Sequence, residues 1–101
     1  MIKFAYIYAM PGLKKPDIHT VTSDSATFYA VAIDYAEPEQ VIDAAKMLVT
    51  DKQVNMIELC GGLANADYVS QVKAVVGPTV AVGQVMYGPE FRRPLVQLLH
   101  L

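Results

Sequence analysis

The chain of 101 residues suits one domain, which we expect to span residues 1–101. Hydrophobic residues make up 53% of it and charged residues only 18%, whereas an average globular chain has about 25% charged residues. The formal net charge is -2, and the only adjacent basic pairs are Lys14-Lys15 and Arg92-Arg93. Nucleic-acid binding needs a clustered basic face that displaces counterions, so we exclude nucleic acid as a partner.

The compartment is indicated by what the sequence lacks. One cysteine cannot form an internal disulfide, so nothing points to an oxidising compartment. The apolar stretch FAYIYAM is short and runs into Pro11-Gly12 without a cleavage-like pattern of small residues. No stretch approaches the roughly 18 apolar residues of a membrane span. We therefore expect a cytoplasmic protein without a membrane partner.

The first third of the chain predicts strands. Residues 3–10, KFAYIYAM, are rich in aromatic and β-branched types and stop at Pro11-Gly12, which predicts a buried strand. Residues 11–18 carry two prolines and a glycine and predict a loop. A polar-alternating run and an apolar run then flank the turn at 23–25, which predicts a hairpin over residues 19–33.

Helices and strands alternate in the rest of the chain. The clearest helix covers 36–52, with Pro38 at its first position, Lys52 in its last turn, and an apolar stripe of Val41, Ala45, Leu48 and Val49. A strand follows at 54–60. Asn65 then caps a helix over 66–76 that Gly77-Pro78 ends, with four inward-facing valines: Val69, Val72, Val75 and Val76.

The chain ends with a strand, TVAVGQVMY, and a short apolar helix, PLVQLLHL. Alternation of strands and helices after residue 28 predicts right-handed βαβ crossovers. The expected fold is a single small α/β domain, with a mainly parallel sheet and an N-terminal hairpin. We expect both faces of such a sheet to be covered.

Two side chains of the segment VNMIELCGG are candidates for catalysis. Alternation along the strand points Glu58 and Cys60 to the same side. A Glu58 carboxyl that is partly desolvated has a raised pKa and suits a general acid or base; the alternative is a structural hydrogen-bond acceptor. Cys60 suits a nucleophile only with a partner such as His19 or His100, and neither histidine lies in a cysteine-protease context. We expect Cys60 to be largely buried and unreactive.

The turn after this strand is the candidate ligand-binding site. Gly61 and Gly62 let backbone approach a ligand closely, and the helix that Asn65 begins offers free N–H groups to an anion. Open α/β sheets bind ligands beyond the carboxyl ends of their strands, where Asp34 and Tyr87 also lie. Glycines at strand-to-helix turns also have ordinary steric reasons. Two histidines and one cysteine, far apart in sequence, make no metal motif.

Four segments resemble a family of small bacterial proteins of unknown function, the domain-of-unknown-function family 6506: FAYIYAMPG, the hairpin that begins HTV, EQVIDAAKMLV and above all VNMIELCGG. The resemblance covers residues 3 to about 88. It implies a compact α/β domain and carries over no activity, cofactor or catalytic residue, so we expect no cofactor.

The apolar composition predicts self-association. A domain of this size cannot hide 53% hydrophobic residues in one core, so some should be buried against another subunit. The tail at 94–101 is apolar nearly all round, and we expect it at or near the contact. The leading hypothesis is a homo-oligomeric α/β domain that binds a small molecule or anion at the strand carboxyl ends. The alternative is a self-association module without chemistry.

Overall fold

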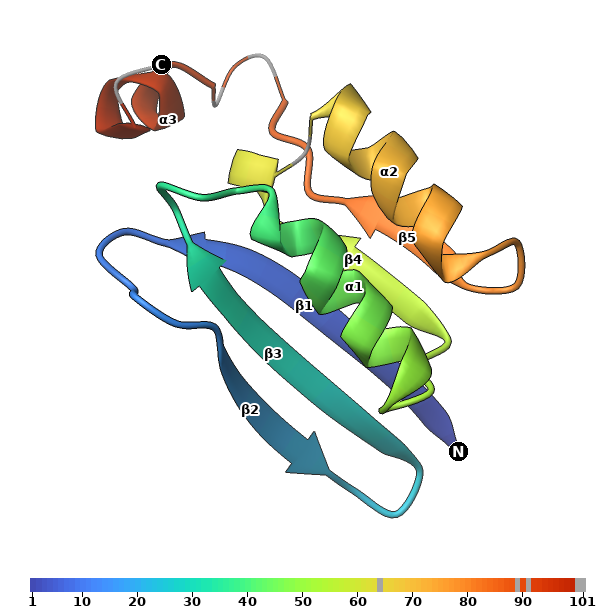
Figure 1. The fold of residues 1–101 in the computed structure, drawn as a ribbon. Helices are drawn as coiled ribbons and strands as arrows, with labels where there is room; N and C mark the ends of the chain where they lie inside the picture. The colour runs from blue at the N-terminus through green and yellow to red at the C-terminus, as the bar shows by residue number, and fades with distance from the viewer. Residues whose placement is uncertain (64, 89, 91, 100–101) are drawn as a thin grey trace.

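The protein is described by a computed structural model that covers residues 1–63, 65–88, 90 and 92–99. The five strands are β1 (Ile2–Met10), β2 (Asp17–Thr22), β3 (Ala26–Asp34), β4 (Met56–Leu59) and β5 (Ala81–Gln84). The helices are α1 (Gln40–Thr50), α2 (Ala66–Val76), α3 (Arg92–Leu99) and a single 3₁₀ turn, η1 (Gly61–Leu63). Figure 1 shows α1 and α2 lying side by side on the sheet.

The five strands form one sheet in the order β2-β3-β1-β4-β5. The neighbours β3, β1, β4 and β5 are all parallel, and only β2 runs antiparallel, against β3. The predicted α/β class, the mainly parallel sheet and the N-terminal hairpin are therefore confirmed. Because β1 lies at the centre, it pairs with β3 on one side and β4 on the other.

Both crossover helices lie on the same face of the sheet (Figure 1). The chain passes from β3 over β1 to β4, and then from β4 to β5, so both crossovers step in the same direction. Crossovers of one hand that step the same way put their helices on one side. The expectation that both faces would be covered is wrong, because a second helical layer requires the chain to reverse its direction across the sheet.

The hydrophobic core lies between the sheet and the two helices. Alternate residues of the inner strands point to this side, and Ile7, Ile33 and Leu59 are fully buried there. They meet the stripe that was predicted for α1, of which three members are buried and Val49 is half-buried. On α2, Val72 and Val76 are buried and Val69 is half-buried, but the prediction for Val75 is wrong, since it lies on the outer side.

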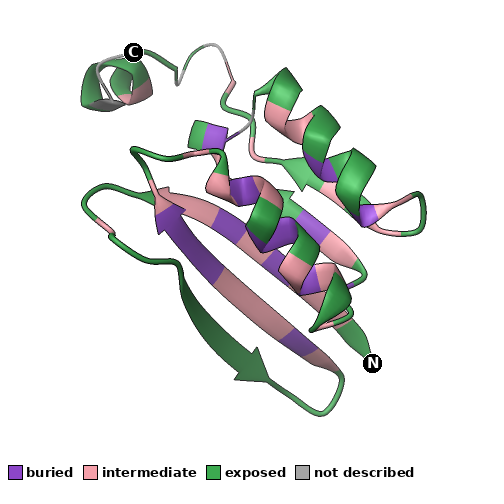
Figure 2. Ribbon diagram, in the orientation of Figure 1, coloured by how far each residue is buried: buried purple, intermediate pink, exposed green. Residues whose placement is uncertain are grey.

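The opposite side, here called the open sheet face, carries the other set of alternate residues. No helix of the described residues packs on it (Figure 1). Apart from the small Ala32, which is buried, the apolar side chains of its strands are only partly buried or exposed. Figure 2 shows buried positions on the strands and on the helices that cover the other face. The open sheet face includes Phe4, Tyr6, Tyr8, Val21, Phe28 and Met56, together with Glu58.

The ends of α2 match their prediction, and those of α1 do not. The Oδ1 of Asn65 accepts hydrogen bonds from the backbone N–H groups of Asp67 (2.9 Å) and Tyr68 (3.3 Å), and Gly77 closes the helix. Pro38 precedes α1, because the first bonds there are tight i to i+3 bonds such as Val41 N to Pro38 O, 3.1 Å. Lys52 lies beyond α1, with its ammonium 5.9 Å from the centre of the Tyr29 ring.

Helix α3 lies apart from the two-layer body, beyond the carboxyl ends of the strands (Figure 1). It begins two residues before the predicted 94–101 segment, and residues 100 and 101 of that segment lie outside the described residues. Leu98 is 74% exposed and Val96 41% exposed. None of the described helices has the length and apolar character that crossing a membrane requires.

Replacing Gly77 with alanine should destabilise the protein, because Gly77 has φ 83° and an L side chain is strained there. We expect Gly77→Ala to lower the free energy of unfolding by about 1–3 kcal/mol, measured by urea denaturation, because φ 83° with ψ 176° is a conformation that is essentially restricted to glycine. Gly83→Ala is the control, since Gly83 lies in a strand and a Cβ there meets nothing closer than the Glu58 Cγ at 3.9 Å. Equal stability of Gly77→Ala and the parent protein would contradict this role.

Candidate ligand-binding site

The carboxyl ends of the four parallel strands surround one pocket of about 180 Å³. Each strand contributes the residue or loop that follows its last hydrogen-bonded pair, as expected for an open α/β sheet. The lining residues are Tyr6, Ala9, Pro11, Tyr35, Cys60, Gly61, Gly62, Tyr87 and Leu95. The pocket therefore lies where the topology of the sheet predicts a ligand-binding site.

Three tyrosines from separate parts of the chain form much of the wall. Tyr6 comes from β1, Tyr35 follows β3, and Tyr87 follows β5. Tyr6 and Tyr8 stack along β1 with ring centroids 6.0 Å apart. Aromatic rings of this kind offer an apolar surface and a hydroxyl that both donates and accepts hydrogen bonds. The pocket can thus hold a small, partly apolar molecule that carries polar groups.

The turn after β4 brings its backbone to the pocket. The backbone N–H of Cys60 donates to Ile7 O at 3.0 Å, which extends the pairing with β1 by one residue. The N–H of Leu63 then donates to Cys60 O at 2.9 Å and starts η1, while the Leu63 side chain is buried in the core. Gly61 and Gly62 are held between these two anchors, at the edge of the pocket.

Gly61 lies in close contact with the Tyr87 ring. A Cβ atom at Gly61 would lie 3.0 Å from Cε1 of Tyr87, closer than carbon atoms normally approach. At Gly62 a Cβ would meet only the Cys60 sulfur, at an ordinary 3.8 Å. The first glycine therefore lets the Tyr87 ring lie against the backbone, whereas the second has no such constraint.

The Tyr6 phenol lies among other ionisable groups. Its burial raises the pKa above the ordinary value for tyrosine, and the negative charges that Cys60, Tyr87 and Glu58 acquire on ionisation raise it further. The phenol is therefore protonated at neutral pH and can donate a hydrogen bond to a ligand in the pocket.

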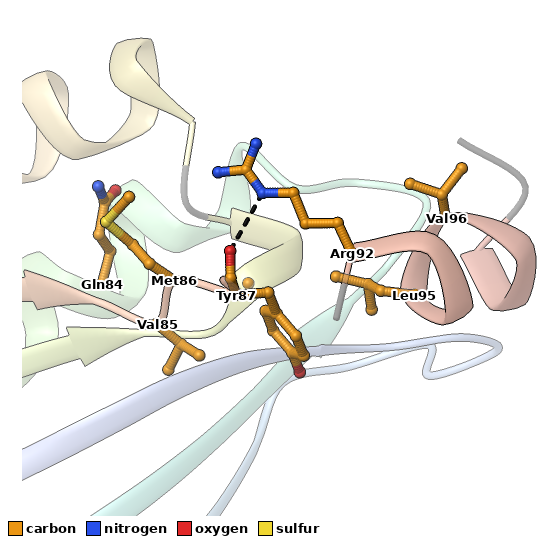
Figure 3. A pocket seen from close by; sticks show the side chains of 8 residues that line it. Gln84, Val85, Met86, Tyr87, Arg92, Leu95 and Val96 are labelled. Carbon is orange, nitrogen blue, oxygen red and sulfur yellow. Dashed lines mark hydrogen bonds between the residues drawn. The ribbon is translucent and has the colours of Figure 1, made fainter. Parts of the chain in front are cut away.

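A second hollow of about 230 Å³ adjoins the pocket and shares Gly61, Tyr87 and Leu95 with it. Figure 3 shows Arg92 of α3 reaching over this hollow toward the end of β5. The Arg92 Nε donates to the backbone oxygen of Tyr87 at 3.1 Å. This bond orients the guanidinium, and its two terminal nitrogens can donate to an anion.

The predicted site residues are placed in three different ways. Gly61, Gly62 and the half-buried Cys60 line the pocket. Glu58 is exposed on the open sheet face, where the absence of a covering helix leaves its carboxylate in solvent. Asn65 uses its side-chain oxygen to cap α2, so its role as a ligand contact stays a prediction.

The remaining polar candidates have local structural roles. The Asp34 carboxylate accepts from the backbone N–H of Ala36 at 3.0 Å. The His19 Nε2 lies 3.1 Å from the Asp17 carboxylate on the edge strand β2. Strand β4, which Cys60 directly follows, is three strands away in the sheet. No described histidine is therefore placed to activate Cys60. Among the described residues, no three His, Cys, Asp or Glu side chains are grouped in a way that would hold a metal ion.

Sequence reasoning missed Tyr6, Tyr35 and Arg92. A signal was present for Tyr35, which closely follows the predicted hairpin, whereas Tyr6 lies in the middle of the predicted strand 3–10 and carried none. Arg92 had no such signal, since its position depends on how the segment after β5 turns back over the sheet edge. Aromatic residues close to strand ends deserve the same weight as glycines when sites of this kind are sought.

Fold and site together define a class of protein: a small two-layer α/β domain with a tyrosine-lined pocket at the carboxyl ends of its parallel strands. The chain belongs to the family of unknown function DUF6506, whose model matches residues 2–100. The predicted membership is confirmed, and the match extends beyond the residue 88 at which the resemblance ended. A search of curated proteins finds no significant match.

Gly61→Ala should displace the Tyr87 ring, because the added methyl group occupies the space next to Cε1. We expect altered chemical shifts of the Tyr87 ring protons in NMR spectra. Since Tyr87 is 41% exposed and can move outward, the loss in stability should stay below about 1 kcal/mol. Gly62→Ala is the matched control and should leave these resonances in place. Identical Tyr87 shifts in both variants would show that the ring does not rest on Gly61.

The Cys60 thiol should react slowly in the folded protein, because its side chain is half-buried against the turn and the Tyr6 ring lies close by. We expect Ellman's reagent to label native protein at least tenfold more slowly than protein unfolded in urea. Native labelling as fast as in the unfolded chain would revive the hypothesis that Cys60 is a nucleophile.

Proposed function

We propose that this protein is a homo-oligomeric α/β domain that binds a small organic anion at the carboxyl ends of its strands. One observation carries the proposal: three tyrosines, the Gly61-Gly62 backbone and Arg92 converge on two adjoining hollows. Binding sites in proteins are typically apolar clefts with a few well-placed polar groups, and this combination fits that description.

The size and chemistry of the site narrow the class of ligand. A pocket of about 180 Å³ accepts a molecule of roughly ten non-hydrogen atoms, below the drug-sized range of about 300–1,000 Å³. The tyrosine walls suit a flat or apolar body. Arg92, whose guanidinium is always charged, suits a carboxylate or phosphate at the end that lies toward α3. A small aromatic or unsaturated acid meets both requirements.

The site supports binding more strongly than catalysis. Cys60 has no described base beside it, and Glu58 lies in solvent on the open sheet face. A nucleophile or general base is normally activated by such a neighbour or by desolvation. We therefore propose a binding protein, in which the protonated Tyr6 phenol and the Arg92 guanidinium recognise polar groups of the ligand.

A second candidate is a self-association module without a ligand. The uncovered sheet face, with its aromatic side chains, favours this alternative. The two candidate functions differ in whether small anions bind in the pocket. Native mass spectrometry of the purified protein would report the oligomeric state and any retained ligand in one measurement.

Benzoate is a suitable probe of the pocket, since it combines a flat ring with a carboxylate. We expect it to shift the backbone amide resonances of Gly61, Gly62 and Tyr87 in ¹⁵N NMR spectra, and benzamide, which lacks the charge, to bind more weakly. Arg92→Gln should weaken benzoate binding about fivefold, as ~1 kcal/mol from a partly exposed ion pair implies. Arg93→Gln is the control, because the neighbouring Arg93 does not line the hollow.

Two outcomes would count against the proposed site. The first is that benzoate, phosphate and related small anions all leave the three amide resonances unshifted. The second is that Arg92→Gln and Arg93→Gln weaken benzoate binding equally. The second outcome would indicate a general attraction to positive charge on α3 instead of a defined contact.

A further inference from the structure

The open sheet face is apolar over its centre. Phe4 of β1 and Phe28 of β3 are directly paired in the sheet, and their ring centroids lie 4.9 Å apart. Tyr6 and Tyr8 continue this row along β1, and Met56 of β4 and Val21 of β2 flank Phe4 and Phe28. Val21 is 66% exposed. A contiguous apolar surface of this kind, on a two-layer fold, marks an interaction site.

The charges on this face argue against nucleic acid as its partner. The only lysine or arginine in the five strands is Lys3, and alternation places it on the side of the helices. The open sheet face carries instead Glu58 and, near the outer edge, Asp17 with His19 paired to it at 3.1 Å. Stacking platforms for nucleic acids combine aromatic rings with a positively charged groove, and the positive groove is missing from the described strands.

The area of the open sheet face fits a second copy of the chain. At ~3.3 Å per residue and ~4.8 Å between strands, the five strands present about 500 Å² of flat surface. Two copies stacked face to face would bury about 1,000 Å² before their rims contribute, which reaches the size of a specific interface. Because the aromatic row lies on the central strand β1, a twofold axis through it pairs the row with itself.

We propose, building on the self-association proposed above, that the open sheet face is the interface of a homodimer in which the two sheets pack on each other. Each copy then supplies the second layer that the other lacks. Glu58, the one carboxylate near the centre, is the sheet partner of Tyr6, whose hydroxyl is a hydrogen-bond donor. This arrangement differs from a dimer through the α3 tail, because α3 lies beyond the strand ends (Figure 1).

The test is light scattering coupled to size exclusion on the full chain at about 50 µM, with variants that add one charge. The parent protein should have twice the 11.0 kDa mass of one chain. Ala30→Glu adds a carboxylate at the middle of β3, opposite Tyr6, and should weaken the dimer at least 100-fold. Val21→Lys adds a charge at an exposed position where the fold cannot depend on the native side chain, and should also yield monomer.

Leu98→Glu on α3 is the matched control, because Leu98 is even more exposed than Val21 but lies away from the sheet. It should remain a dimer. Circular dichroism of each variant verifies folding, and Val21→Lys keeps the test valid if Ala30→Glu does not fold. A monomeric parent protein, dimeric Ala30→Glu and Val21→Lys variants, or dissociation by Leu98→Glu would each overturn the proposed interface.

Benzoate binding to the Val21→Lys variant separates this proposal from the proposed ligand site. A variant that is monomeric and still shifts its Gly61 amide with benzoate shows that the interface and the pocket are independent. A dimeric parent protein whose amide resonances do not shift with benzoate would count against the ligand site alone.

Discussion

The packing of both crossover helices on one face of the sheet is the constraint on which the rest of this structure depends. It follows from a strand order that advances from β3 to β4 to β5 in one direction. All the fully buried aliphatic side chains, among them Ile7, Ile33 and Leu59, lie on the covered side. The 53% hydrophobic content of the chain therefore has only one core to fill, and the surplus appears as the aromatic surface of the open sheet face.

The same topology produces the pocket. Four strands that run in parallel end at one edge, so the loops that follow them meet there, although they are far apart in sequence. At this edge Gly61 has no side chain, which leaves room for the Tyr87 ring against the backbone. Arg92 completes the edge from α3, through its bond to the Tyr87 carbonyl group (Figure 3).

Tyr6 connects the two surfaces of interest. It stands on the open sheet face beside Tyr8, and it also lines the pocket at the strand ends. A partner on the open sheet face and a ligand in the pocket would both contact this residue or its immediate neighbours. Variants that test the interface and the pocket separately must therefore change residues that belong to only one surface, such as Val21 for the open sheet face and Arg92 for the pocket.

The sequence by itself determined the elements and their order, because these depend on local chemistry. Asn65 and Gly77 mark the ends of α2 through capping and a positive φ, and alternation along VNMIELCGG separates Leu59 from Glu58. The glycine turn and the edge of the sheet where a pocket forms were also predictable from these patterns. Only the tertiary structure decided that one sheet face stays uncovered, so that Glu58 is exposed, and which valines of α2 face the sheet, so that Val75 points outward. It also decided that Tyr6, Tyr35 and Arg92 meet at the pocket. Those results depend on the direction of the crossovers and on the path of the chain after β5, which no local pattern of residues encodes.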